Sequence, residues 1–136
     1  MAQDNNPKTP FGNEKLSVQH VPLAPVYLAG LAHYQGALKY GPFNWRFQHV
    51  SASTYIEAAR RHIGHWAGGE ENAKDSGIHH LAHAVASLNI LMDAQLHDTL
   101  VDDRNRSPLD YDEFFDQHRT TLENIRAKWG KKDEEE

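Results

Sequence analysis

The sequence predicts an all-α protein built from four helices. Apolar residues recur at helical spacing in four segments, and residues that start or stop helices bound those segments. No stretch of useful length alternates apolar and polar residues as a strand does. The 136 residues suffice for one domain with a single core. We expect that domain at 15–128, between a flexible N-terminus (1–14) and a disordered acidic tail (129–136).

The first expected helix covers residues 23–39. Pro25 suits an early helical position, and Gly41-Pro42 ends the helix. Gly30 and Gly36 weaken this helix locally, but they would let another helix approach closely.

The second and third expected helices form a central hairpin. The second helix runs from the hydroxyl-rich start at 51–54 to Ala67, where Gly68-Gly69 ends it. The third would be capped by Asp75-Ser76 and run to Leu96. An apolar seam follows its length: Ile78, Leu81, Val85, Leu88 and Met92. Because His80 and His83 project from another side, we expect this helix to be buried on both sides, either centrally or against another subunit.

The fourth expected helix covers residues 110–128. Its apolar residues follow one face, with acids early and bases late, which is the favourable order for the helix dipole. They are Tyr111, Phe114, Phe115, Leu122 and Ile125.

Composition excludes several classes of protein. The chain has no cysteine, so neither disulfides nor thiolate zinc sites can form. A net charge of −5 without a long basic stripe argues against a nucleic-acid partner. No apolar run approaches the ~18 residues of a membrane span, and no signal peptide is evident. We therefore expect a cytoplasmic protein with neither membrane nor nucleic-acid partners.

Histidines concentrate in the hairpin, where five of the chain's ten lie between His62 and His83. His80 and His83 are three residues apart, so both imidazoles could hold one ion or one phosphate. The other interpretation is a pair of hydrogen-bonded histidines at a helix interface. His62 and His65 repeat this spacing, but His62 falls on an apolar stripe, where a buried structural histidine is equally expected.

Acidic residues accompany these histidines. Glu57 and Arg61, four residues apart, form either a plain surface pair or a metal ligand beside a bidentate phosphate clamp. Glu70 and Asp75, in or beside the turn, could supply the oxygen ligands that Mg²⁺ or Mn²⁺ prefers. Glu71 is expected to be solvent-exposed.

The loop after the first helix offers a base-binding set. Lys39 could contact a phosphate, Asn44 could contact a base edge, and Trp45 could stack on a base. Trp45 could equally fill the core.

Several motifs together resemble a known family: Leu28-Ala-Gly-Leu-Ala, Lys39-Tyr-Gly-Pro-Phe-Asn44-Trp45, Arg61-His62, Gly69-Glu70, Asp75-Ser-Gly77 and His80-Leu-Ala-His83-Ala. The chain resembles phage dATP/dGTP diphosphohydrolases over about residues 14–96. It is similar to the MazZ-type enzymes of the MazG/HisE all-α nucleotide pyrophosphohydrolase superfamily. The resemblance implies a MazG-like four-helix bundle that assembles as a homo-oligomer, a dimer or a tetramer.

The resemblance also implies an activity. A purine deoxynucleoside triphosphate, dGTP above all, would be cleaved to dGMP and pyrophosphate with Mg²⁺ or Mn²⁺, in a phage pathway to 2-aminoadenine nucleotides. The superfamily's metal ligands are carboxylates in an ExxE and ExxD pattern. Here His80 and His83 replace the second pair, and Glu57 alone remains of the first.

We therefore expect these metal ligands: Glu57, His62, Glu70, Asp75, His80 and His83. The expected catalytic residues are Glu57 and Arg61, and the expected substrate-binding residues are Lys39, Asn44, Trp45 and Arg61. Two alternatives stay open. One is a His/Asp-metal enzyme that releases whole triphosphate, although adjacent His-Asp occurs only at His97-Asp98. The other is a non-catalytic helical module that binds metal or a partner.

Overall fold

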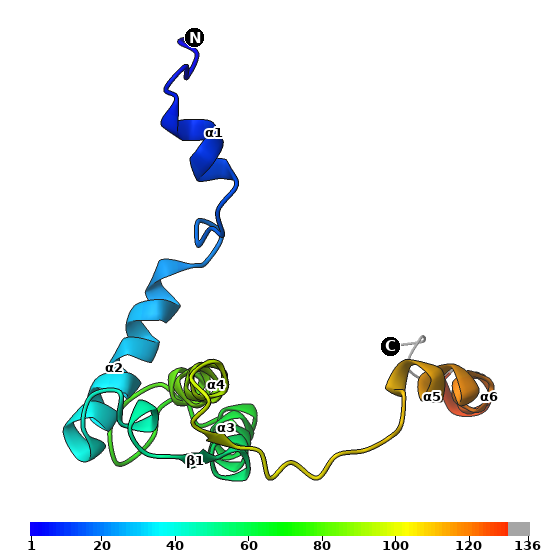
Figure 1. Cartoon of the computed structure of the whole chain (residues 1–136). Coiled ribbons are helices and arrows are strands. Elements are labelled where there is room, and N and C mark those ends of the chain that lie inside the picture. Colours follow the sequence, from blue (N-terminus) through cyan, green and yellow to red (C-terminus); the bar gives the residue numbers. More distant parts are fainter. Residues whose placement is uncertain (131–136) are drawn as a thin grey trace. The chain divides into compact units, whose positions relative to one another are not determined.

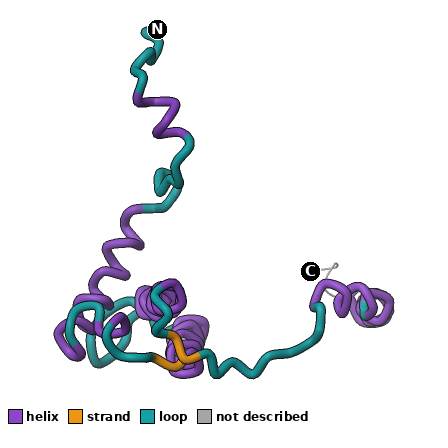
Figure 2. The backbone as a smooth tube through the Cα atoms, viewed as in Figure 1, coloured by secondary structure: helices purple, strands orange, loops and turns teal. Residues whose placement is uncertain are grey.

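The computed structural model describes residues 1–130 and is mostly helical, which confirms the all-α class. The helices are α1 (Lys8–Asn13), α2 (Leu23–Tyr40), α3 (Ala52–Ala67), α4 (His80–Leu96), α5 (Tyr111–Gln117) and α6 (Arg119–Trp129), with a 3₁₀ turn at Asn44–Arg46 (Figure 1). Two short strands, β1 (Val50–Ser51) and β2 (Leu100–Val101), pair in parallel (Figure 2). The chain divides into two compact units, Met1–Asp103 and Arg104–Glu136.

Small side chains hold the helices of the first unit together. The buried apolar residues of the described chain are all alanines: Ala29 and Ala32 on α2, Ala52 and Ala59 on α3, Ala73 in the following loop, and Ala82, Ala84, Ala86 and Ala94 on α4. No larger apolar side chain within residues 1–130 is fully buried. Because alanine adds little beyond the backbone, α3 and α4 can approach closely, and polar side chains between them are brought into contact.

Helix α4 starts later than the sequence predicts. Asp75 and Ser76 lie in a loop, and the helix begins at His80, capped by His79, whose Nδ1 accepts the backbone N–H of Leu81 at 3.0 Å. The loop closes on itself through the Ala73 N–H to Ile78 carbonyl bond at 2.8 Å. Gly77 has a φ of +74°, which a residue inside a right-handed helix does not adopt. Helix α4 therefore begins only after this turn.

The buried side of α4 is the side that carries the histidines. His80 is 3% exposed, and Ala84 and Ser87 on the same side are also buried. The apolar seam is half-exposed instead, with Val85, Leu88 and Met92 between 42% and 58% exposed. Within the described chain the apolar seam of α4 is therefore left half-exposed, as burial of that seam against another subunit would require.

The fourth expected helix is two helices, α5 and α6, which meet at His118. Asp110 caps α5 by accepting the backbone N–H groups of Asp112 and Glu113. Both helices belong to the second unit, so the long helices of the first unit are α2, α3 and α4.

At the N-terminus, expected to be flexible, residues 8–13 form α1. The expected acidic tail lies, from residue 131 onward, outside the described residues. Among the residues described, no helix combines the length and apolarity needed to cross a membrane.

Candidate functional site

A cavity of about 300 Å³ opens between α2, α3, α4 and the loops beside them. Most of the expected site residues line it: Lys39, Asn44, Trp45, Arg61, His62, Asp75 and His83. Tyr40, Tyr55 and Ser87 complete much of its wall. Two cations, three imidazoles (His33, His62 and His83), a carboxylate and aromatic rings thus meet in one space. We call it the polar cavity.

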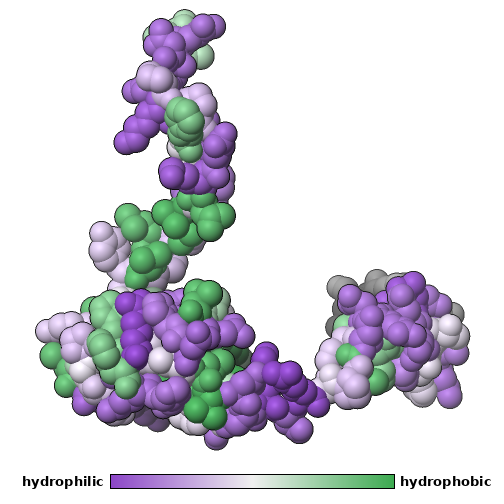
Figure 3. Space-filling view, in the orientation of Figure 1, coloured by the Kyte–Doolittle hydropathy of each residue, from purple (hydrophilic) through white to green (hydrophobic). Residues whose placement is uncertain are grey.

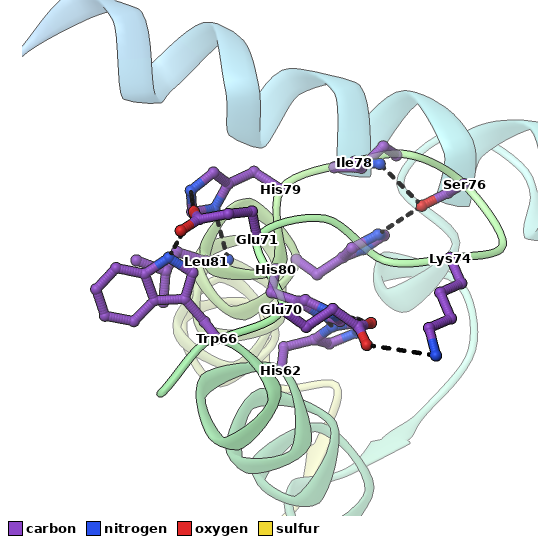
Figure 4. A network of polar contacts seen from close by, with 11 residues as sticks. His62, Trp66, Glu70, Glu71, Lys74, Ser76, Ile78, His79, His80 and Leu81 are labelled. Atoms are coloured by element: carbon purple, nitrogen blue, oxygen red, sulfur yellow. Dashed lines mark hydrogen bonds and ion pairs between the residues drawn. The ribbon is translucent and has the colours of Figure 1, made fainter. Parts of the chain in front are cut away.

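Glu70, His80 and His62 form a chain of hydrogen bonds behind this cavity (Figure 4). The Glu70 carboxylate lies 2.8 Å from His80 Nε2, and His80 Nδ1 lies 2.8 Å from His62 Nδ1. The His62 ring also stacks on His83, with centroids 4.4 Å apart and planes 15° from parallel. These hydrogen bonds therefore link the turn after α3 to α3 itself, through His80 at the start of α4.

The carboxylate at one end assigns the protons along the chain. A carboxylate only accepts, so His80 Nε2 carries the proton and donates it to Glu70. In the tautomer with one proton on His80, its Nδ1 carries a lone pair that accepts the N–H at Nδ1 of His62. His62 is left with a lone pair at Nε2. Every deeply buried polar side-chain atom of the described chain has a hydrogen-bond partner, so this unpaired Nε2 is accessible.

The electrostatics agree with a neutral His62. Burial, followed by the nearby His83, His80, Arg61 and His65, lowers the pKa of His62 from 6.5 to about 4. The hydrogen bond from His80 lowers the pKa of the Glu70 carboxyl, which keeps it ionised as an acceptor.

His83 is held by the loop before α4. Its Nε2 lies 3.1 Å from the Ser76 hydroxyl, which also accepts the backbone N–H of Ile78 at 3.2 Å. Burial lowers the pKa of His83, while the neighbouring Asp75 carboxylate opposes that shift. The Asp75-Ser76 pair therefore positions a site histidine instead of capping a helix.

A possible metal-binding group lies beside the polar cavity. His65, Glu70 and His80 each offer one ligand atom, and these three atoms lie within 4.8 Å of one another. His65 and Glu70 also line a second, open cavity of about 390 Å³, together with Gly64, Gly68 and Arg61. Arg61 lines both cavities.

Glu57 is the expected residue that lies apart. It is largely exposed, does not line the polar cavity, and its carboxylate lies 3.9 Å from the Arg61 guanidinium. Glu71 is exposed, as expected, and accepts the indole N–H of Trp66 at 3.1 Å.

Sequence reasoning missed the residue that holds Trp45 in place. Asp93 accepts the Trp45 indole N–H at 2.6 Å and binds the Arg46 guanidinium through both oxygens, at 2.8 and 3.0 Å. The signal was available, because Asp93 is the one formally charged residue of α4. With its N–H bound, Trp45 lines the polar cavity as an aromatic side chain.

The stability of the metal-free protein should fall as the pH falls from 6.5 to 4. Unfolded His62 takes up a proton in this window, whereas folded His62, with its pKa lowered to about 4, does not. The free energy of unfolding, from urea titrations across this range, should therefore decrease as the pH falls. The variant His62→Gln should show a smaller decrease. Equal pH dependence in both proteins would show that His62 is not held neutral by the fold.

Comparison with known proteins agrees with this geometry. The model of the family described as dATP/dGTP diphosphohydrolase, N-terminal, matches residues 5–104. This range contains both cavities and ends where the first compact unit ends. No curated protein and no solved structure matches the chain. The chain therefore belongs to the dATP/dGTP diphosphohydrolase family, and is a hydrolase that acts on triphosphate anhydride bonds.

Proposed function

We propose that the protein hydrolyses a purine deoxynucleoside triphosphate, with dGTP preferred, to dGMP and pyrophosphate in phage nucleotide metabolism. The observation that carries this proposal is the polar cavity, where Lys39 and Arg61 meet three imidazoles, a carboxylate and Trp45. The preference for dGTP and the place in a 2-aminoadenine pathway rest on the family resemblance. A cytoplasmic location follows from where such substrates occur.

The chain's own residues divide the work. Lys39 and Arg61 neutralise the phosphates, and the planar guanidinium of Arg61 suits bidentate contact with phosphate oxygens. The ring of Trp45 stacks on the base, and Asn44 contacts its edge. Asp75 orients the attacking water, since it is the carboxylate that lines the cavity. Glu57, 3.9 Å from Arg61, helps to orient that guanidinium.

We propose that the reaction depends on Mg²⁺ or Mn²⁺. Such an ion would offset charge on the polyphosphate and activate a water. The expected ligands separate into two groups, which fits more than one ion. Asp75 and His83 line the polar cavity, whereas Glu70 and His80 belong to the group beside it. His62 also lines the polar cavity, but its bond to His80 suits it to hydrogen bonding there. Glu57 belongs to neither.

Product analysis with each dNTP and Mn²⁺ tests the function. dGTP should yield dGMP and pyrophosphate. Arg61→Ala should lower kcat/KM by roughly 100-fold, as expected for one lost donor to developing phosphate charge. The matched control is Arg60→Ala, which removes a neighbouring exposed arginine that does not line the polar cavity. Release of nucleoside and triphosphate would establish the His/Asp-type alternative, and turnover of no nucleotide would establish a non-catalytic module.

We also propose that the protein is a homo-oligomer, a dimer or a tetramer. Helices α2 and α4 each carry one formally charged residue, Lys39 and Asp93 respectively. Helices with so few charges are normally well buried, yet many of their larger apolar side chains are exposed here, among them Leu31 and Leu38 on α2 and Leu88 and Met92 on α4. Figure 3 shows apolar atoms gathered at the surface where α2 begins. An apolar cavity of about 670 Å³ between α2 and α4 adds to this uncovered surface.

Light scattering after size exclusion should give a multiple of the 15.5 kDa chain mass. Leu88 and Met92 lie on the exposed seam of α4. The double substitution Leu88→Asp and Met92→Asp should shift the protein toward the mass of one chain, while its helical circular dichroism persists. Leu16→Asp is the control, because Leu16 is fully exposed outside the helices. A wild-type protein with the mass of one chain would contradict the proposal.

A further inference from the structure

We infer that His65, Glu70 and His80 bind one transition-metal ion outside the polar cavity, and that this ion turns His62 into a hydrogen-bond donor inside it. The ion site stands on geometry alone. The coupling to phosphate binding rests on the function proposed above.

The three ligand atoms already lie close to bonding distance of a common point. They are within 4.8 Å of one another, and His80 Nε2 is 2.8 Å from Glu70. An ion bound at ~2.1 Å in tetrahedral geometry needs donors roughly 3.4 Å apart. His80 is buried and held, whereas His65 is exposed at the side chain. The His65 ring stacks on that of His80, with centroids 5.0 Å apart and planes 8° from parallel, so it must turn out of this stack to direct a nitrogen at the ion.

The site also has room for an ion and its remaining ligands. Gly64 lies inside α3 between Arg61 and His65, and a Cβ at Gly64 would meet nothing within 4 Å. A glycine inside a helix costs about 1 kcal/mol relative to alanine, and no packing within the described chain requires this one. Its missing side chain widens the open cavity of about 390 Å³ that His65 and Glu70 line. Water can thus reach the open coordination positions.

The donor set selects the ion. Two imidazoles and one carboxylate suit Mn²⁺, Fe²⁺, Co²⁺ or Zn²⁺, whereas Mg²⁺ prefers oxygen ligands throughout. The site should therefore discriminate against Mg²⁺, even if Mg²⁺ accompanies the nucleotide in the polar cavity.

The second nitrogen of His80 connects the ion to the polar cavity. An ion at His80 requires the lone pair of Nε2, so the proton must move to Nδ1. That N–H then donates to His62 Nδ1, 2.8 Å away, which becomes the acceptor. The proton of His62 consequently resides on Nε2. His62 changes from acceptor to donor without any change in charge.

This change has a direct consequence in the polar cavity, which His62 lines. A lone pair at Nε2 repels a phosphate oxygen, whereas an N–H attracts it. Occupation of the ion site should therefore strengthen phosphate binding in a neighbouring cavity, without any contact between that ion and the phosphate.

Calorimetric titration of the metal-free full chain with ZnCl₂, MnCl₂ and MgCl₂ tests the ion site. Wild type should bind one Zn²⁺ per chain, and Mg²⁺ should not compete. His65→Ala should weaken Zn²⁺ binding at least tenfold. The matched control His49→Ala, at an exposed loop histidine, should bind as wild type does. Zn²⁺ binding that is absent from wild type, or unchanged in His65→Ala, would overturn the site.

Binding of dGMP, a weak chelator, then tests the coupling. Zn²⁺ should tighten dGMP binding to wild type by about fivefold or more. In His65→Ala that gain should be lost, while dGMP binding to the metal-free protein stays as in wild type, because His65 does not line the polar cavity. Equal dGMP affinity with and without Zn²⁺ in wild type would overturn the coupling and leave the ion site intact. Failure of dGMP to bind either form would overturn the coupling together with the assigned substrate.

Discussion

The hydrogen-bonded chain from Glu70 through His80 to His62 is the interaction on which the site depends. It joins the turn after α3, the first residue of α4 and the middle of α3 in two bonds of 2.8 Å. Because a carboxylate ends the chain, His80 donates from Nε2, and the number of protons on His80 then sets whether His62 donates or accepts at Nδ1. The candidate metal group and the polar cavity share this chain, which is why neither can change alone.

Alanine packing makes the chain possible. The buried residues of α3 and α4 are small, so the helices approach closely enough for imidazoles on both to bond directly. Because only small apolar residues are buried between the helices, many of the larger apolar side chains of α2 and α4 are exposed to solvent. When the small and polar faces of two helices form the site, their larger apolar residues need another surface, such as a second chain, to cover them. This requirement connects the internal site to the proposed assembly of several chains.

The sequence predicted the elements better than their contacts. Helical spacing and breakers located α2, α3 and the end of α4, and histidine spacing predicted that His62, His80 and His83 lie close together, as they do. The start of α4 was missed because Asp75-Ser76 has the composition of a helix cap, while the actual cap is the imidazole of His79. The break in the fourth expected helix was missed. The apolar face continues past His118, where no glycine or proline marks the change from α5 to α6.

Contacts between distant residues were beyond sequence reasoning. His65 was not among the expected metal ligands, yet it lies with Glu70 and His80. Its role depends on how the turn folds back, which residue spacing along one helix does not reveal. Asp93 binds Trp45 across 48 positions of sequence, and only the packing of the 3₁₀ turn against α4 brings them together. Residue type predicted the kind of chemistry, whereas tertiary packing decided the partners.

Nitrogen NMR of the imidazole rings, recorded before and after addition of Zn²⁺, tests the central claim most directly. In the metal-free protein the account predicts a proton on Nε2 of His80 and on Nδ1 of His62. With Zn²⁺ bound, both rings should carry the proton on the other nitrogen. A His62 tautomer that stays the same while Zn²⁺ binds His80 would contradict the account.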